Sequence, residues 1–239
     1  PEKLAWLLAI QGRNEILGGF QSGIYIIDID RGGERQFVMD PEPGITGNRL
    51  NDAVCDIQGC VWTGTMDDKE IEPSGWFYRI DTDLTCSVCD GPFVISNGPA
   101  ISPDDRTLYH VDTVNRSIYA YTKHHDGTIH SRRLFKQFDK NDGNPDGLTI
   151  DSEGYIWVAH WGGGKVSRLS NSGVVDFVLE IPALQVTNCI FGGPEMNLLF
   201  VSTAARNVGN KETLGAGSIF YIETNVIGPQ PGRFDGSKL

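Results

Sequence analysis

The sequence has no long apolar run and little positive charge. No stretch reaches the roughly 18 apolar residues that a membrane-spanning helix requires, and the apolar opening at residues 4–10 lacks the basic start of a signal peptide. Lys and Arg together number 20 against 31 Asp and Glu, which gives a net charge of −11. Nucleic acids and anionic membranes are bound through basic patches, so we expect neither as a partner.

Cysteine is also scarce. The five cysteines are an odd number with uneven spacing, which is not typical of a secreted disulfide framework. Two pairs, Cys55 with Cys60 and Cys86 with Cys89, offer zinc ligands in principle. Both pairs lie in strand-like sequence without a zinc-ribbon turn, so buried thiols are the favoured interpretation. A reducing, cytoplasmic location fits this cysteine content best.

Helical periodicity is missing as well, and a repeat takes its place. A turn rich in Gly, Asp, Asn or Pro, followed by an apolar strand, recurs about every 43 to 49 residues. The turns lie at residues 11–14, 56–59, 102–106, 151–154 and 193–197. This spacing is the length of a four-stranded propeller blade. We therefore expect one all-β domain over residues 1–239 with about five blades, and a frayed tail at residues 228–236.

Polar residues with side-chain oxygens occupy matching places in three repeats. Asn51, Asn97 and Asp146 each immediately precede the first strand of a blade. Taken singly, Asn-Gly and Asp-Gly are common turn signals. Their matched positions favour convergence on one point of a central channel, where one carboxylate and amide oxygens form a hard site. Such a site suits Ca²⁺, Mg²⁺ or Mn²⁺, with Zn²⁺ and Fe²⁺ as alternatives.

The chain resembles the gluconolactonase and regucalcin family, which includes senescence marker protein and luciferin-regenerating enzyme. The matching segments are Asn48-Arg49-Leu50-Asn51-Asp52, Gly64-Thr65-Met66-Asp67-Asp68, Ile95-Ser96-Asn97-Gly98, Leu108-Tyr109-His110-Val111-Asp112-Thr113, Asn144-Pro145-Asp146-Gly147-Leu148, Trp157-Val158-Ala159-His160-Trp161-Gly162-Gly163-Gly164 and Phe191-Gly192-Gly193. The resemblance implies a six-bladed β-propeller with one divalent cation, calcium being the first choice. It also implies Asn97 and Asp146 as metal ligands and Arg49 and Asn51 as sugar-binding residues.

The chain departs from the family pattern in two places. The family's third ligand is a Glu in a Gly-Glu-Gly-Pro-like segment of a first blade, and this sequence has no such segment. We therefore expect the first blade, its Glu and its closing strand to be missing, and open sheet edges to promote homo-oligomers. An acidic position of some family members aligns with Lys69, so that role is not carried over.

The expected activity is metal-dependent hydrolysis of a small-molecule sugar lactone, with Asp146 as both ligand and general base. Two alternatives stay open, namely a non-catalytic calcium-binding regulatory propeller and a propeller esterase or phosphotriesterase. Arg49 and Asn51 suit a polyhydroxylated substrate, which favours the lactone. His160 has no evident acidic partner in the sequence and is interpreted as a wall residue.

Overall fold

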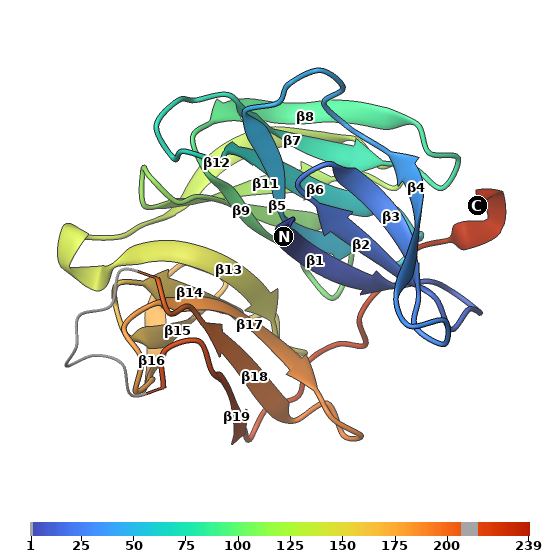
Figure 1. Cartoon of the computed structure of the whole chain (residues 1–239). Coiled ribbons are helices and arrows are strands. Elements are labelled where there is room, and N and C mark those ends of the chain that lie inside the picture. Colours follow the sequence, from blue (N-terminus) through green and yellow to red (C-terminus); the bar gives the residue numbers. More distant parts are fainter. Residues whose placement is uncertain (1, 207–214) are drawn as a thin grey trace. The chain divides into compact units, whose positions relative to one another are not determined.

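The computed structural model describes residues 2–206 and 215–239, and β-strands dominate its regular structure (Figure 1). Within these ranges no helix is long and apolar enough to cross a membrane. The described elements are β1 (Leu4–Ala9), β2 (Ile16–Phe20), β3 (Gly23–Asp28), β4 (Glu34–Met39), β5 (Asn48–Cys55), β6 (Val61–Asp67), β7 (Gly75–Ile80), β8 (Cys86–Phe93), β9 (Ser96–Ile101), β10 (Thr107–Asp112), β11 (Ser117–Lys123), β12 (Ile129–Gln137), η1 (Lys140–Asp142), β13 (Asn144–Ile150), β14 (Ile156–Trp161), β15 (Lys165–Leu169), β16 (Val175–Glu180), β17 (Val186–Gly192), β18 (Leu198–Thr203), β19 (Ile219–Glu223) and η2 (Gly236–Lys238).

The strands form five meander sheets, in each of which neighbours in the chain are neighbours in the sheet. The sheets β1–β4, β5–β8, β9–β12 and β13–β16 have four strands, and β17–β19 has three within the described ranges. Short connections between antiparallel neighbours produce this order, because a tight turn can join only adjacent strands. The prediction of an all-β chain with about five propeller blades is confirmed. A sixth blade remains a prediction of the family resemblance.

In two blades, a buried aspartate of the turn after the first strand is bonded to a buried tryptophan of the second strand. Asp56 Oδ1 accepts hydrogen bonds from two backbone N–H groups of its own turn, at 2.9 and 3.0 Å, and Oδ2 accepts one from Trp62 Nε1 at 2.9 Å. Asp151 does the same, with Trp157 Nε1 at 3.0 Å. Because a buried carboxylate must be satisfied by donors, the turn and the indole are fixed together. This explains why Asp and Trp recur six residues apart.

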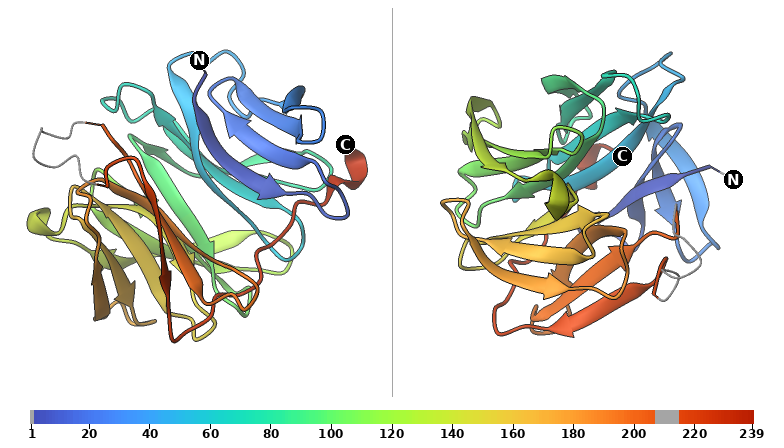
Figure 2. Two further views of the ribbon diagram at one scale, coloured as in Figure 1. Left: turned by 60° about the horizontal axis from the view of Figure 1, so that its bottom comes forward. Right: turned by 90° about the vertical axis from the view of Figure 1, so that its left-hand side faces the viewer.

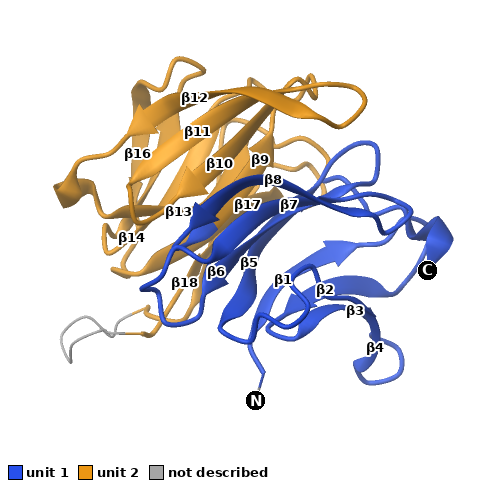
Figure 3. Cartoon of the chain, turned by 90° about the horizontal axis from the view of Figure 1, so that it is seen from above, with its two compact units in different colours: residues 1–96, 231–239 blue, residues 97–230 orange. Residues whose placement is uncertain are grey.

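The contacts divide the chain into two compact units (Figure 3). Unit 1 comprises residues 1–96 and 231–239, and unit 2 comprises residues 97–230. Each unit has its own buried apolar core, which is what stabilises stacked sheets. The core of unit 1 is built from Trp6, Ile10, Leu17, Ile24, Ile26, Leu50, Cys55, Val61, Ile80 and Phe234. Unit 2 has two clusters, one from β9–β14 with β15 and the other mainly from β14–β18.

The predicted frayed tail is wrong for its last part, which belongs to unit 1. Phe234 is 1% exposed and forms a parallel bridge with Ile10. Its N–H donates to Ala9 O, and its carbonyl accepts from Gln11 N–H, each at 2.9 Å. The red C-terminal segment can be followed to this place beside the first sheet in Figure 2. Burial of one phenylalanine side chain stabilises the folded state by about 1.5–3 kcal/mol. This burial holds the segment in place although Gly and Pro surround Phe234.

Candidate active site

Two predicted metal ligands lie side by side in unit 2. Asn97 is in β9 and Asp146 is in β13. Asn97 Nδ2 donates a hydrogen bond to Asp146 Oδ1 and a longer one, of 3.3 Å, to Thr113 Oγ1. Asn97 is 6% exposed, whereas Asp146 is half-buried and so reachable from solvent. The structure thus brings together the amide and the carboxylate that the repeat predicted. Thr113 was not predicted to contact them.

The backbone at both ligands explains how they meet. The pairing of β13 with β14 shifts by one residue between Pro145 and Leu148, so a bulge contains Asp146. A bulge re-aims the side chain that it carries, which is why bulges are frequent beside active sites. Gly98 has a φ of +28°, and a Cβ there would lie 2.6 Å from Leu148 N. Only glycine permits this close approach of β9 to β13.

Arg49 and Asn51 lie together on β5 in unit 1. Arg49 Nη1 donates to Asn51 Oδ1 at 2.9 Å and to Leu50 O at 3.0 Å. Asn51 Nδ2 donates to Ser96 O at 2.8 Å. The Arg49 side chain is 18% exposed. The guanidinium and the amide are therefore held in a fixed relation, which suits recognition of a polar ligand more than a mobile side chain would.

An unpredicted carboxylate pairs with this arginine. Asp68 Oδ1 lies 3.2 Å from Arg49 Nε and accepts a hydrogen bond from Lys3 Nζ. The backbone N–H of Asp68 also bonds Gly47 O at 3.0 Å. Lys69, by contrast, is exposed. Asp68 thus orients Arg49. Asn48 pairs with Asp67 across β5 and β6, so knowledge of this strand register would have placed Asp68 beside Arg49.

A second unpredicted carboxylate anchors the start of β5. Glu42 is 6% exposed and accepts hydrogen bonds from Asn48 Nδ2 at 2.8 Å, Thr65 Oγ1 at 2.6 Å and Tyr78 OH at 2.8 Å. Burial, followed by the hydrogen bond to Glu42, raises the pKa of Tyr78, so the phenol stays a donor. Because Asn48 directly precedes Arg49, this network fixes the position of the Arg49 backbone.

Glu42→Ala should therefore destabilise the protein. Tyr78 OH loses its acceptor, whereas Asn48 Nδ2 keeps Ser74 O at 2.8 Å and Thr65 Oγ1 keeps Trp76 O at 3.3 Å. An unsatisfied buried group costs about 1–3 kcal/mol, so we expect a loss of about this size in the free energy of unfolding, measured by urea denaturation. Glu42→Gln keeps the size and one acceptor oxygen and should lose less. A Glu42→Ala variant as stable as the wild type would show that the network contributes nothing.

His160 packs as an apolar wall residue. Its ring meets Phe138 edge-on, with centroids 4.9 Å apart, and it lies opposite Pro145 in the β13–β14 pairing. Burial, then the charge of Lys165, lowers the pKa of His160 to about 4. The imidazole is therefore neutral at pH 7, and its surroundings are those of a packed side chain.

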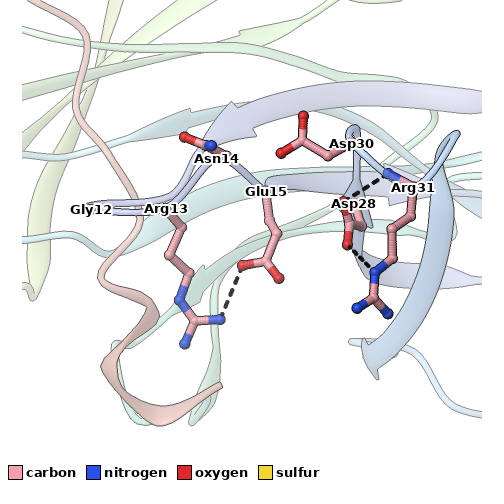
Figure 4. Close-up of a pocket in the computed structure, with 7 residues that line it drawn as sticks. All are labelled: Gly12, Arg13, Asn14, Glu15, Asp28, Asp30 and Arg31. Atoms are coloured by element: carbon pink, nitrogen blue, oxygen red, sulfur yellow. Dashed lines mark hydrogen bonds and ion pairs between the residues drawn. The ribbon is translucent and has the colours of Figure 1, made fainter.

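An open depression of about 540 Å³ lies elsewhere in unit 1 (Figure 4). Two of its carboxylates are already paired with arginines on the same wall. Glu15 lies 3.4 Å from Arg13, and Asp28 lies 3.4 Å from Arg31. Ion pairs at such exposed positions contribute little, and these acidic residues offer no built site.

The comparisons with known proteins identify the family. A family model described as the SMP-30/gluconolactonase/LRE-like region matches residues 1–205. This chain belongs to that family. It is 33% identical to 6-deoxy-6-sulfogluconolactonase of Pseudomonas putida, over 99% of this chain and 82% of the relative. It is 30% identical to L-arabinolactonase of Azospirillum brasilense, over 99% of this chain and 80% of the relative.

Solved structures support the same family through the fold. A calcium-binding protein, regucalcin, from Agrobacterium tumefaciens is 26% identical, with a TM-score of 0.92 over 98% of this chain and 80% of that one. A luciferin-regenerating enzyme is also 26% identical, with a TM-score of 0.89 over 98% of this chain and 82% of that one. The family resemblance predicted from the sequence motifs is confirmed.

In this member of the gluconolactonase family, the donors fit a hard divalent cation. Asn97 and Asp146 would hold it through amide and carboxylate oxygens, the ligands that Ca²⁺, Mg²⁺ and Mn²⁺ prefer. Asn97 Nδ2 faces Asp146, and Asn97 Oδ1 accepts from Gly98 N–H at 3.1 Å, so cation binding through Oδ1 requires the amide to turn over and give up this hydrogen bond.

A cysteine-based zinc site finds no support in the described part of the chain. No group of three or more His, Cys, Asp and Glu side chains is placed to hold a metal within it. Burial raises the pKa of Cys86 to about 11 and that of Cys89 to about 12. Both therefore remain protonated thiols at neutral pH. Cys55 and Cys60 are buried, as the interpretation as buried thiols predicts, whereas Cys86 and Cys89 are half-buried.

Proposed function

We propose that this chain hydrolyses a sugar lactone with the help of one divalent cation, and that Asp146 is both a ligand and the general base. The observation that carries the proposal is the contact between the Asn97 amide and the half-buried Asp146 carboxylate. It occurs in a chain whose named relatives include lactonases of sulfogluconate and arabinose type. Calcium is our first choice, because a structural relative is named a calcium-binding protein.

Lactone hydrolysis needs a base, and Asp146 can be one. Water adds to the lactone carbonyl carbon while a carboxylate takes one of its protons, and the ring C–O bond then breaks. The proton passes to the departing ring oxygen, so the product is an open-chain hydroxy acid. A bound cation would supply polarisation of the carbonyl oxygen and a more acidic water. The Asn97 amide is neutral and cannot take a proton from water, so the carboxylate of Asp146 beside it is the proposed base.

Arg49 and Asn51 are proposed as the substrate-binding residues. A guanidinium offers several in-plane donors, and an amide both donates and accepts, which matches the hydroxyl and ring oxygens of a sugar. A lipophilic ester or a phosphotriester would gain little from this pair. The arrangement therefore favours a polyhydroxylated lactone over the esterase alternative.

The localisation and the oligomeric state of this protein are two further proposals. We propose that it works in the cytoplasm, as its cysteine content predicts. We also propose homo-oligomers through the edge of β19, where Ile219 is 73% and Tyr221 is 69% exposed. Within the described residues β18 is the sheet neighbour of β19, so its other edge can accept a strand.

Acid release measured in a pH-stat tests the activity. The protein should release acid from gluconolactone or arabinolactone faster than from an aryl acetate or a phosphotriester. Arg49→Ala should raise KM about tenfold or more, because a hydrogen bond to a charged group contributes about 1.5–3 kcal/mol. Absence of lactone hydrolysis under all metal conditions would leave the non-catalytic calcium-binding alternative. Faster turnover of the aryl ester would favour the esterase.

A further inference from the structure

One polar residue occupies the position of Asp146 in the next blade along the chain. In β13, Ile150 pairs with Ile156, and Asp146 lies four residues before Ile150. In β17, Gly192 pairs with Leu198, and the residue four before Gly192 is Asn188. The same offset from the turn marks Asn97 in β9. The registers of β13 and β17, together with the sequence offset of Asn97 in β9, therefore put one amide or carboxylate at an equivalent place on these three strands.

The backbone irregularity recurs with it. The β17–β18 pairing shifts by one residue between Val186 and Asn188, so the extra residue directly precedes Asn188, whereas the β13–β14 shift lies between Pro145 and Leu148 and contains Asp146. Bulges that lie close to one polar position in successive blades aim particular side chains. Asn188 is half-buried, as Asp146 is. Its position is thus not that of an ordinary exposed strand residue.

Asn188 also touches the backbone that carries Asp146. A Cβ on Gly147 would lie 2.2 Å from Asn188 Cγ, 2.5 Å from its Oδ1 and 2.6 Å from its Nδ2. The whole amide therefore lies over the Gly147 Cα, in the space that a side chain would need. Gly147 is required because of this contact, independently of its turn preference.

The amide itself is held by its own strand. Asn188 Oδ1 accepts a hydrogen bond from Cys189 N–H at 2.7 Å, as Asn97 Oδ1 does from Gly98 N–H at 3.1 Å. The two asparagines thus share a conformation in which the residue that follows fixes the amide plane. A side chain fixed in this way can hold a neighbour in place, which a freely rotating one cannot.

We propose that Asn188 is a positioning residue of the cation site, which holds the Asp146–Gly147 bulge so that the Asp146 carboxylate faces the cation. Asn97 contacts the carboxylate of Asp146, and Asn188 contacts the next residue of the same bulge. Residues that orient a ligand control metal affinity although they do not bind the metal. This inference rests on the proposed cation site and adds a residue that its sequence motifs did not reveal.

The test is calorimetric titration of Ca²⁺ into chelated full-length protein, repeated with Mg²⁺, Mn²⁺ and Zn²⁺. Asn188→Ala removes the contact and should weaken cation affinity about tenfold, the usual cost of losing an orienting partner. Asn188→Asp keeps the shape and the acceptor for Cys189 N–H, so it should fold and bind at least as tightly as the wild type. Ser202→Ala is the matched control, because Ser202 pairs with Asn188 across the sheet and should not alter binding.

The outcomes separate this inference from the proposed function. Wild-type affinity in Asn188→Ala, within about twofold, would overturn the role of Asn188 and leave the cation site standing. A wild type that binds none of the four cations would overturn both. If Asn188→Ala does not fold, Asn188→Asp decides alone. Binding weaker than wild type in that variant would contradict the inference, since an added negative charge near a cation strengthens binding.

Discussion

Replacing Asp146 with asparagine should lower kcat for lactone hydrolysis by about 10²–10⁴-fold, the usual contribution of a general base. Asparagine has nearly the same shape, so β13 should keep its bulge and the contact with Asn97 should remain. What disappears is the carboxylate that we propose as the base. The measurement is acid release from a saturating lactone in a pH-stat, with the cation in excess, so that weaker cation binding does not limit the rate.

Asp142→Asn is the matched control for this experiment. Asp142 is another carboxylate of unit 2, and it forms a part-buried ion pair with Lys165 at 2.8 Å. Its removal should change kcat by less than about twofold, because its side chain bonds Lys165 and the Asp139 N–H and has no part in the proposed proton transfer. Both variants should melt near the wild-type temperature. If Asp146→Asn retained wild-type turnover, Asp146 would not be the base.

Removal of divalent cations should abolish most of the turnover. Without a cation, the developing charge on the carbonyl oxygen loses its stabilisation, and loss of such a term typically costs about 10²–10³-fold. EDTA removes the divalent cations from the protein, the EDTA is then removed, and acid release is measured. Restoring Ca²⁺, Mn²⁺ or Zn²⁺ one at a time should recover the activity and identify the effective ion.

The same samples give a second readout that does not depend on activity. A ligand at about 100 times its Kd stabilises the folded state by about 2.7 kcal/mol, so the effective cation should raise Tm. Asp146→Ala should show no such rise, because it removes a ligand. Full turnover in the chelated protein would contradict the metal-dependent scheme and favour chemistry carried by the side chains.

Much of the fold could be predicted from the sequence because the blades repeat. Turns with Gly, Asp, Asn or Pro at blade length are local signals, and each blade is a meander of neighbouring strands. The pair Asn97 and Asp146 could be found for the same reason, since each is followed by a glycine that is a turn signal in the sequence, although the structure places both pairs inside the strands β9 and β13. Their contact in unit 2 is what equal offsets within repeats predict.

The unpredicted residues depend on information that is not local. Glu42 gains its donors from β5, β6 and β7, and Asp68 meets Arg49 through strand pairing. Phe234 is buried against residues more than 200 positions away in the chain. Asn188 lacks the glycine that marks its counterparts, being followed by Cys189, so only the strand register reveals it. Local turn signals cannot report such pairings.

Anomalous scattering tests most directly whether Asn97 and Asp146 share one cation. Crystals soaked in Mn²⁺ should show an anomalous peak bonded to an Asp146 carboxylate oxygen and to Asn97 Oδ1, at the roughly 2.0–2.6 Å typical of oxygen ligands of divalent cations. Absence of a peak beside these two side chains, in crystals of protein that hydrolyses lactone, would contradict the account.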